Sequence, residues 1–169
     1  MTLEQPLAVR PPRTLAEAAE AHLDDVLGYL LYLTRDREAA EDLTSSTFEK
    51  AVRLWARFDA DRGTARTWLL GIARTTALDW FRAETRRRKR EEAAALPERV
   101  DEAFAEGLSP ALEAALAALS AGEREVLALR VVLELDGDAT ARVLGISPTA
   151  VSTRLSRALK RLEERVNEE

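Results

Sequence analysis

The stretch LGISPTAVSTRLSRALKRL, Leu144 to Leu162, decides the fold of the C-terminal part of this chain. Its apolar residues recur at helical spacing, so one flank of a helix is expected to pack on a small core. This flank comprises Val151, Leu155, Leu159 and Leu162. The opposite flank carries short hydroxyl side chains beside basic ones. Such a flank is either a solvated helix surface or a surface for a partner with base edges and phosphates.

The residues before this helix predict a helix-turn-helix. A small-residue helix ending at Leu144 is followed by Gly145, which can adopt the left-handed conformation that ends a helix, and Ser147 can cap the next one. In a helix-turn-helix the second helix enters the major groove of DNA. Arg157 would then reach a guanine edge or the backbone, with Arg154 and the later basic residues nearer to phosphates. An ordinary amphipathic C-terminal helix remains the alternative from these residues alone.

The rest of the chain also shows helical periodicity, with 7 glycines in 169 residues and no alternating strand pattern. Thr14 with Glu17, and Ser120 with Glu123, have the spacing of capping boxes, and Asp36 is expected to cap a second long helix. We therefore expect an all-α protein. The expected buried side of the second helix is Leu43, Phe48, Val52, Trp55 and Phe58. The helix after Ser120 is expected to present Val126, Leu127, Leu129, Val131 and Leu133.

Composition predicts two small helical domains joined by a flexible acidic linker. Residues 93–109 are acidic, poor in large apolar side chains and interrupted by proline and glycine, so they are not expected to form a core. The expected domains are therefore residues 14–92 and 110–166. At 18.8 kDa the chain is long enough for two modest cores.

Charge and residue usage exclude several classes of function. The chain has no cysteine, and His22 is its one histidine, so we expect neither disulfides nor a metal site nor a cofactor. No secretory signal or membrane-spanning run is apparent, which predicts a cytoplasmic protein without membrane insertion. No phosphate-binding loop or nucleophile motif appears, so we expect no enzyme activity and no small-molecule substrate. The net charge of -5 argues against a protein that coats nucleic acid.

Local positive charge contrasts with this acidic balance. The block RRRKR, residues 86–90, continues the exposed side of a third predicted helix, which carries Arg74, Thr75, Asp79 and Arg82. Cations beside aromatic residues suit single-stranded DNA with a base turned out of its stack. A solvated helix end that complements the helix dipole is the alternative.

Three blocks carry a family resemblance: AEDLTSSTFEKAVRLW (40–55), RTWLLGIARTTALDWFR (66–82) and LSAGEREVLALRVVLELDGDATARVLGISPTAVSTRLSRALKRL (119–162). Together, in this order, they resemble a bacterial sigma factor of the sigma-70 family, of the extracytoplasmic-function (ECF) type. An unrelated repressor has no reason to carry the first two blocks. The resemblance implies two helical DNA-binding domains, region two and region four, and a promoter-directed role in transcription initiation.

The resemblance also implies partners: core RNA polymerase, contacted at the largest-subunit clamp and at the flap, promoter DNA, and an anti-sigma factor. The implied clamp contacts are Asp42, Leu43, Ser45, Ser46 and Glu49. The residues implied to open the −10 element and hold its non-template strand are Asp61, Arg62, Arg66, Arg74, Thr75, Asp79, Arg82 and Arg86. Those implied to read the −35 element are Thr149, Ser152, Thr153, Arg154, Ser156, Arg157 and Lys160.

Two other functions fit part of the pattern. A stand-alone helix-turn-helix repressor would bind its operator directly and is expected to have a dimerisation helix. A helical adaptor would bind only protein through its polar faces. Sequence-selective DNA binding without polymerase separates the repressor from the sigma factor, and absence of DNA binding with polymerase identifies the adaptor.

Overall fold

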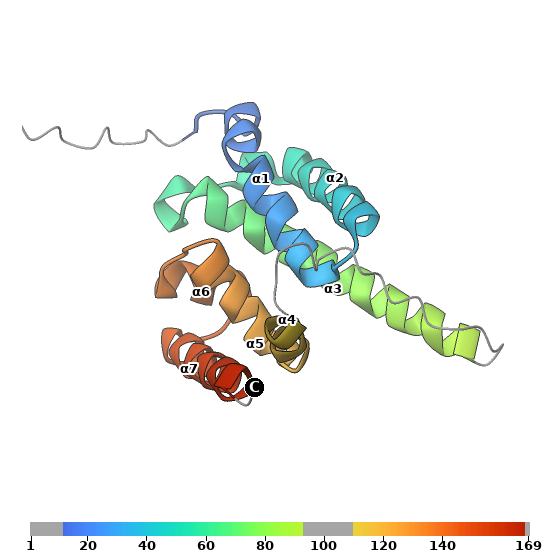
Figure 1. The fold of residues 1–169 in the computed structure, drawn as a ribbon. Coiled ribbons are helices and arrows are strands. Elements are labelled where there is room, and N and C mark those ends of the chain that lie inside the picture. Colours follow the sequence, from blue (N-terminus) through green and yellow to red (C-terminus); the bar gives the residue numbers. More distant parts are fainter. Residues whose placement is uncertain (1–11, 93–109, 168–169) are drawn as a thin grey trace, which may run out of the picture.

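Every regular element of the protein that can be described is helical (Figure 1). The computed structural model describes residues 12–92 and 110–167, which leaves the predicted linker at 93–109 outside the described residues. The all-α prediction is confirmed. The N-terminal unit contains α1 (Leu15–Thr34), α2 (Arg37–Leu54), η1 (Trp55–Arg57), η2 (Ala60–Arg62) and α3 (Ala65–Glu92). The C-terminal unit contains α4 (Pro110–Ala117), α5 (Ala121–Leu127), η3 (Ala128–Val132), α6 (Gly137–Leu144) and α7 (Pro148–Asn167).

Local capping chemistry starts the helices. At α5 the capping box is complete, because Glu123 Oε2 accepts a hydrogen bond from the Ser120 N–H (2.9 Å) while Ser120 Oγ accepts one from the Glu123 N–H (3.3 Å). At α1 only half of the predicted box forms. Thr14 caps the helix, but the Glu17 carboxylate accepts from the N–H of Arg13 instead of that of Thr14.

The N-terminal unit is a three-helix bundle in which α1, α2 and α3 pack on one another (Figure 1). Asp36 caps α2 as predicted, accepting a hydrogen bond of 3.0 Å from the N–H of Ala39. The largest fully buried side chains here are those of Val26, Tyr29, Leu30, Leu69 and Leu70. The prediction that Val52 is buried is wrong, because its side chain is 66% exposed. It lies one turn after Glu49 on the outer face of α2, where no other helix covers it.

The buried stripe of α7 differs from the predicted one at a single position. Val151 and Ala158 are fully buried, whereas Leu159 is 47% exposed. Residues 151, 155, 158 and 162 follow the spacing i, i+4, i+7, i+11, which keeps them on one face of a helix. Leu159 is rotated by one residue from this stripe, and the small Ala158 lets α7 approach the rest of the unit closely.

A π-helical turn, η3, shifts the helical register after α5. Its closing hydrogen bond runs from the Leu133 N–H to the Ala128 carbonyl (2.9 Å), a five-residue step in place of the usual four. The extra residue rotates the face presented by this segment. Val131 is therefore 52% exposed and Val132 58% exposed, so the prediction that Val131 faces the core is wrong.

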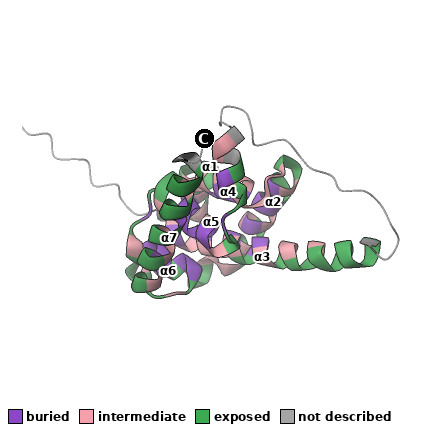
Figure 2. Ribbon diagram, turned by 60° about the horizontal axis from the view of Figure 1, so that its bottom comes forward, coloured by how far each residue is buried: buried purple, intermediate pink, exposed green. Residues whose placement is uncertain are grey.

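The two units pack directly against each other. Helix α3 lies against α6, and α1 contacts η3 (Figure 1). Buried residues of both units, Tyr29 and Leu129 among them, belong to one continuous apolar cluster. Figure 2 shows the buried residues gathered in the body of the molecule, while the far end of α3 projects from the body with mostly exposed residues. The sequence predicts two cores, and the structure joins them.

Gly145 is the residue whose backbone makes the turn between α6 and α7 possible. It has φ +64° and ψ 36°, and its N–H binds the Ala141 carbonyl. We expect Gly145→Ala to reduce the free energy of unfolding by about 1 to 2 kcal/mol, because a Cβ disfavours the left-handed region. The control is Gly28→Ala in α1, where an added Cβ meets nothing within 4 Å. That variant is expected to gain up to about 1 kcal/mol in urea unfolding. An unchanged unfolding midpoint for Gly145→Ala contradicts the prediction.

Candidate nucleic-acid interface

Helix α7 presents the predicted polar row to solvent. It is anchored at its start, where Ser147 Oγ accepts a hydrogen bond of 3.1 Å from the Ala150 N–H. The exposed members of the row are Thr149, Ser152, Thr153, Ser156, Arg157 and Lys160, and Arg154 is half-buried. Thr153 and Ser152 donate to carbonyls one turn back, at 3.0 and 3.2 Å, which leaves their acceptor lone pairs available.

The charged members of this row differ in their freedom. Arg154 lies across α5, where a Cβ built on Gly122 would stand 3.3 Å from its Nη1 atom. Lys160 has an exposed carboxylate partner, Glu164, at 3.7 Å, which is a weak, solvent-screened pair. Arg157 is exposed and forms no ion pair with a described side chain, although its charge helps to lower the pKa of Glu123. It is the cation of the row with the greatest freedom to bind an external acceptor.

The second predicted surface, on η2 and α3, is only partly free. Asp61, Arg62, Thr75 and Arg82 are exposed. Thr75 donates to the Gly71 carbonyl (3.0 Å), and Arg82 pairs with Asp79 at 3.2 Å. Lys50 of α2 also approaches Asp79 (4.0 Å), so this part of α3 carries a small mixed-charge network.

The side chains of Arg66 and Arg74 are both half-buried against other residues. The sequence predicts that Arg74 is exposed. Arg74 Nε lies 3.0 Å from Glu125 Oε1, and its side chain is 24% exposed. Arg66 Nε lies 2.6 Å from Asp25 Oδ2 on α1, and its Nη2 donates to the Leu133 carbonyl at 2.7 Å. The prediction of an exposed Arg74 is wrong, because a carboxylate of α5 lies against it. The C-terminal unit thus occupies both guanidinium groups.

The basic block at the end of α3 is partly neutralised within its own helix. Glu84 pairs with Arg87 (2.6 Å) and with Arg88 (3.3 Å), and Arg87 also pairs with Glu91 (3.1 Å). Hydrogen bonding to Arg87 is the main cause that lowers the pKa of Glu84. Arg86 is exposed on this projecting part of the helix and takes no part in these ion pairs.

Helix α2 carries an outward stripe of different character. Asp42, Ser45 and Glu49 are exposed and Ser46 is half-buried, whereas Leu43 is 6% exposed and belongs to the core. With Glu38 and Val52 the exposed residues follow helical spacing, so they form one acidic stripe that ends in an apolar residue. Leu43 supports this stripe from beneath.

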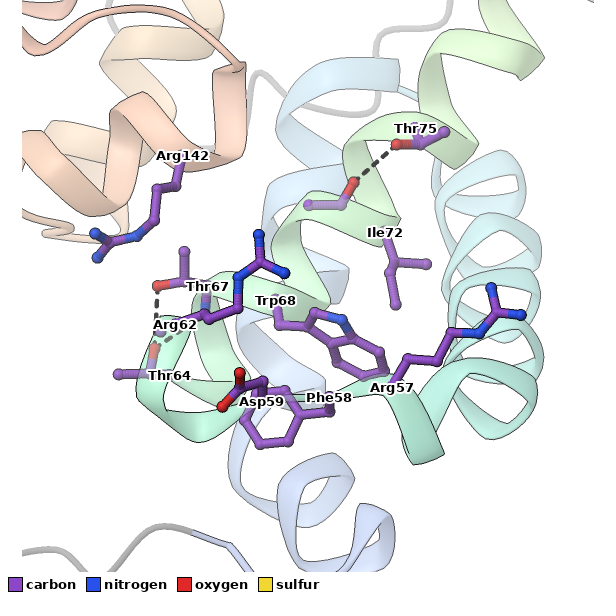
Figure 3. A pocket seen from close by; sticks show the side chains of 12 residues that line it. Arg57, Phe58, Asp59, Arg62, Thr64, Thr67, Trp68, Ile72, Thr75 and Arg142 are labelled. Carbon is purple, nitrogen blue, oxygen red and sulfur yellow. Dashed lines mark hydrogen bonds between the residues drawn. The ribbon is translucent and has the colours of Figure 1, made fainter.

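A pocket of about 380 Å³ lies between the turns before α3, the first turns of α3 and helix α6 (Figure 3). Its aromatic side is formed by Phe58 and Trp68, whose ring centroids are 5.4 Å apart. Arg57, Arg62 and Arg142 line it, the last from α6. The sequence singled out Arg62 alone, because Arg57 and Arg142 carry no local signal that connects them to it.

The carboxylate of Glu123 is tied to both α5 and α7. The hydrogen bond from the Ser120 N–H is the largest cause that lowers its pKa below the ordinary value of 4.5, and Arg161 lies 3.1 Å away. A carboxyl group with a lowered folded-state pKa stabilises the fold above its ordinary pKa, and this contribution disappears as pH falls through the folded-state value.

We therefore expect Glu123→Gln to cost about 1 kcal/mol of unfolding free energy at pH 7. The difference from the unsubstituted protein should shrink as the pH falls below 4.5. Urea unfolding of both proteins between pH 7 and 3 measures it. A difference that stays constant across this range contradicts the assignment.

Among residues 12–92 and 110–167, no three histidine, aspartate or glutamate side chains are grouped so that they could hold a metal ion. No helix in the same ranges has the length and apolar character needed to span a membrane.

Comparisons with known proteins match both units. Residues 18–87 match the family model of sigma-70 region 2, and residues 109–162 match that of sigma-70 region 4. The chain is 35% identical over 150 residues to the ECF RNA polymerase sigma factor SigC of Mycobacterium tuberculosis, covering 86% of this chain and 80% of that protein. It is 27% identical over 164 residues to the ECF RNA polymerase sigma factor SigX of Bacillus subtilis, covering 86% and 79%.

Solved structures show the same architecture. The sigma factor RpoE of Bartonella quintana, in complex with the anti-sigma factor NepR, superposes with a TM-score of 0.75 at 23% identity, covering 90% of this chain and 96% of that one. CnrH, in complex with the cytosolic domain of CnrY, gives 0.68 at 25% identity, covering 92% and 88%. The two region matches, the helix-turn-helix and the identity to SigC together show that this chain belongs to the ECF family of RNA polymerase sigma factors.

Proposed function

We propose that this sigma factor reads the −35 element with the exposed row of α7. The observation that supports this proposal most directly is that hydroxyl side chains and the exposed Arg157 lie together on the second helix of a helix-turn-helix. Arginine binds guanine O6 and N7 in the major groove, and serine and threonine bind base edges or phosphates. Thr149, Ser152 and Thr153 are nearest the start of the helix, which is the part that enters the groove.

The η2–α3 surface is proposed to bind the −10 element. Arg62, Arg82 and Arg86 supply positive charge for the backbone of a separated strand, and Thr75 supplies a hydroxyl. Asp61 and Asp79 favour contacts with base amino groups over phosphates, because carboxylates accept hydrogen bonds and repel anions. Arg66 and Arg74 join this surface when the C-terminal unit leaves it.

The acidic stripe of α2 is proposed to dock on the clamp of the largest polymerase subunit. Asp42, Ser45 and Glu49 are exposed and available for a basic partner, with Ser46 at the edge of the stripe. The buried Leu43 would act only by holding α2 in place. The C-terminal unit, residues 110–166, is proposed to bind the flap of the polymerase. Residues 14–92 are proposed to bind the clamp and the −10 element.

The charge balance supports a factor that needs polymerase. With a net charge of -5, the protein is expected to bind DNA weakly alone, because few phosphate contacts work against an unfavourable overall field. When one large enzyme holds both DNA-binding surfaces, binding of the first raises the effective concentration of the second near its promoter element, so the overall affinity for the promoter increases. The chain then functions in the cytoplasm as a non-enzymatic subunit.

An anti-sigma partner is part of this proposal. RpoE and CnrH are both described in complex with protein partners, NepR and the cytosolic domain of CnrY. The surfaces that such a partner would cover are the α2 stripe or the α7 row.

Run-off transcription with purified core polymerase, on the DNA upstream of the protein's own operon, tests the function. A specific transcript that requires the added protein supports it. Gel-shift assays on the same DNA with and without polymerase separate the other functions. Sequence-selective retardation by the protein alone would support a repressor, and no retardation even with polymerase would support an adaptor.

A further inference from the structure

Lys50 is a cation of α2 whose ammonium group lies against α3, beside the residues proposed to bind the −10 element. Its Nζ donates a hydrogen bond of 3.1 Å to Thr76 Oγ1 and lies 4.0 Å from Asp79 Oδ2. The Lys50 side chain is 34% exposed, so most of its aliphatic stem is covered. No pattern in the sequence marks this lysine, because its partners lie 26 positions and more away in the chain.

The Thr76 hydroxyl fixes the position of the Lys50 ammonium group. It donates its own hydrogen to the Ile72 carbonyl at 2.9 Å, so its lone pairs remain for the donor on Lys50. Thr76 is 4% exposed and packed between the helices, which leaves it little freedom to move. A lysine ammonium commonly ends a flexible, hydrated stem. In this protein it is held against a buried hydroxyl instead, at a defined point on α3.

The carboxylate of Asp79 has a cation beside each of its oxygens. Arg82 Nη1, from the next turn of α3, lies 3.2 Å from Oδ1, and Lys50 Nζ, from α2, lies 4.0 Å from Oδ2. Each of these solvent-exposed pairs is weak by itself. Together they favour one orientation of the carboxylate, because rotation of the group would move one oxygen away from its cation.

We propose that Lys50 is a positioning residue for base selection, which orients the Asp79 carboxylate to accept a hydrogen bond from the amino group of one base in the −10 element. The inference rests on the proposed role of the η2–α3 surface in binding that element. Lys50 acts through Asp79 and does not itself contact DNA. Arg82 holds the other oxygen of the same carboxylate.

The local charge balance explains how an aspartate can face DNA. A carboxylate alone repels phosphates. Lys50, Asp79 and Arg82 combine two cations with one carboxylate, so the group keeps a net positive charge while Asp79 retains lone pairs for a donor. Cytosine and adenine carry amino groups that donate to a carboxylate, whereas thymine and guanine present a carbonyl oxygen at the corresponding place. The arrangement therefore selects cytosine over thymine, or adenine over guanine.

Base selection is measured with holoenzyme assembled from the full-length protein and purified core polymerase. Open-complex formation is compared on the protein's own promoter and on variants that carry each of the four bases at each −10 position of the non-template strand. Lys50→Met, which keeps an unbranched stem, is expected to reduce discrimination between bases with and without the amino group by roughly 5- to 10-fold at one position. Discrimination at the other positions should change by less than about twofold.

Three further variants separate positioning from general damage. Lys50→Gln keeps a donor for Thr76 but no charge, and it should lose the same discrimination. Lys50→Arg keeps the charge and should retain the preference of the unsubstituted protein. Arg53→Met removes the same charge from an exposed site three residues later on α2 and is the matched control, which should leave base preference unchanged. Unchanged preference in both uncharged Lys50 variants would overturn the positioning role.

A double-variant cycle tests whether Lys50 acts through Asp79. In a protein that carries Asp79→Asn, the further change Lys50→Met should cause no additional loss of discrimination, because the carboxylate on which Lys50 acts is already gone. A loss of equal size for every base in either background, with a weaker salt dependence of DNA binding, would identify a direct phosphate contact and overturn the proposal.

The same experiments distinguish this inference from the proposed function. If the unsubstituted protein yields no promoter-dependent transcript with core polymerase, the proposed function fails and the role of Lys50 fails with it. If the transcript is made and its base preference does not depend on Lys50, only the positioning role is wrong.

Discussion

Arg157→Ala is expected to reduce initiation at the cognate promoter by roughly 10- to 100-fold, because one arginine contact with a guanine edge contributes about 1 to 3 kcal/mol. The side chain is exposed, and the Glu123 carboxylate, whose pKa its charge helps to lower, keeps its ion pair with Arg161 at 3.1 Å, so the removal of Arg157 leaves no buried charge unpaired. Run-off transcription measures the loss, and co-elution with core polymerase should stay unchanged. The defect should be smaller on a promoter with a substituted −35 element.

The matched control for this variant is Arg165→Ala, two turns later on α7. Arg165 is exposed and has the same charge, but it lies outside the polar row. It is expected to retain activity within about twofold, since distant exposed cations contribute only weak screened attraction. Equal transcription by both variants would remove Arg157 from promoter reading.

Leu129→Ala is expected to lower the free energy of unfolding by about 3 kcal/mol. Leu129 is fully buried in the cluster that the two units share, and a leucine-to-alanine change in such a site leaves a cavity that costs about 2 to 5 kcal/mol. Val132→Ala, in the same π-helical turn but at a side chain 58% exposed, is the control and should cost under about 0.5 kcal/mol.

Urea unfolding, followed by circular dichroism, compares the two variants. A cost for Leu129→Ala no larger than that for Val132→Ala would contradict the burial assigned to η3. The same measurement tests the joined core, because residues of α1 and α3 pack in the cluster with Leu129. A core confined to the C-terminal unit would leave the unfolding of the N-terminal bundle unaffected.

Helix boundaries were predictable because their causes are local. Asp36, Ser120 and Ser147 cap the helices that the sequence assigned to them, through hydrogen bonds to N–H groups three residues later. Gly145 ends α6 in the left-handed conformation for the same kind of reason. A cap involves one side chain and one turn of backbone, so a short stretch of sequence contains all of its chemistry.

Burial was less predictable where it depends on register or on neighbouring elements. Val131 fits an apolar helical face until the π-helical turn rotates it outward. Leu159 fits the predicted stripe of α7 as well as Ala158 does, and only the close approach of α5 and α4 to α7 favours the smaller residue. An apolar residue type shows that a side chain can be buried. The surface of the neighbouring helices determines which of the apolar side chains is buried.

The candidate site shows the same limit more strongly. Arg157 and the hydroxyls around it were found from helical spacing alone. The pairing of Arg74 with Glu125 connects residues 51 positions apart in different units, and nothing near either residue in the sequence indicates it. A contact of this kind depends on how two helical units dock, which is set by the whole apolar cluster.

The length of α3 has a consequence for how the protein responds to its surroundings. At 28 residues the helix is about 42 Å long, and its last part packs on nothing described, being held together by exposed ion pairs one turn apart. Helical segments supported in this way fray at high ionic strength, because salt screens the pairs that replace tertiary packing. We therefore expect the helical content of this end of α3 to fall as the salt concentration rises.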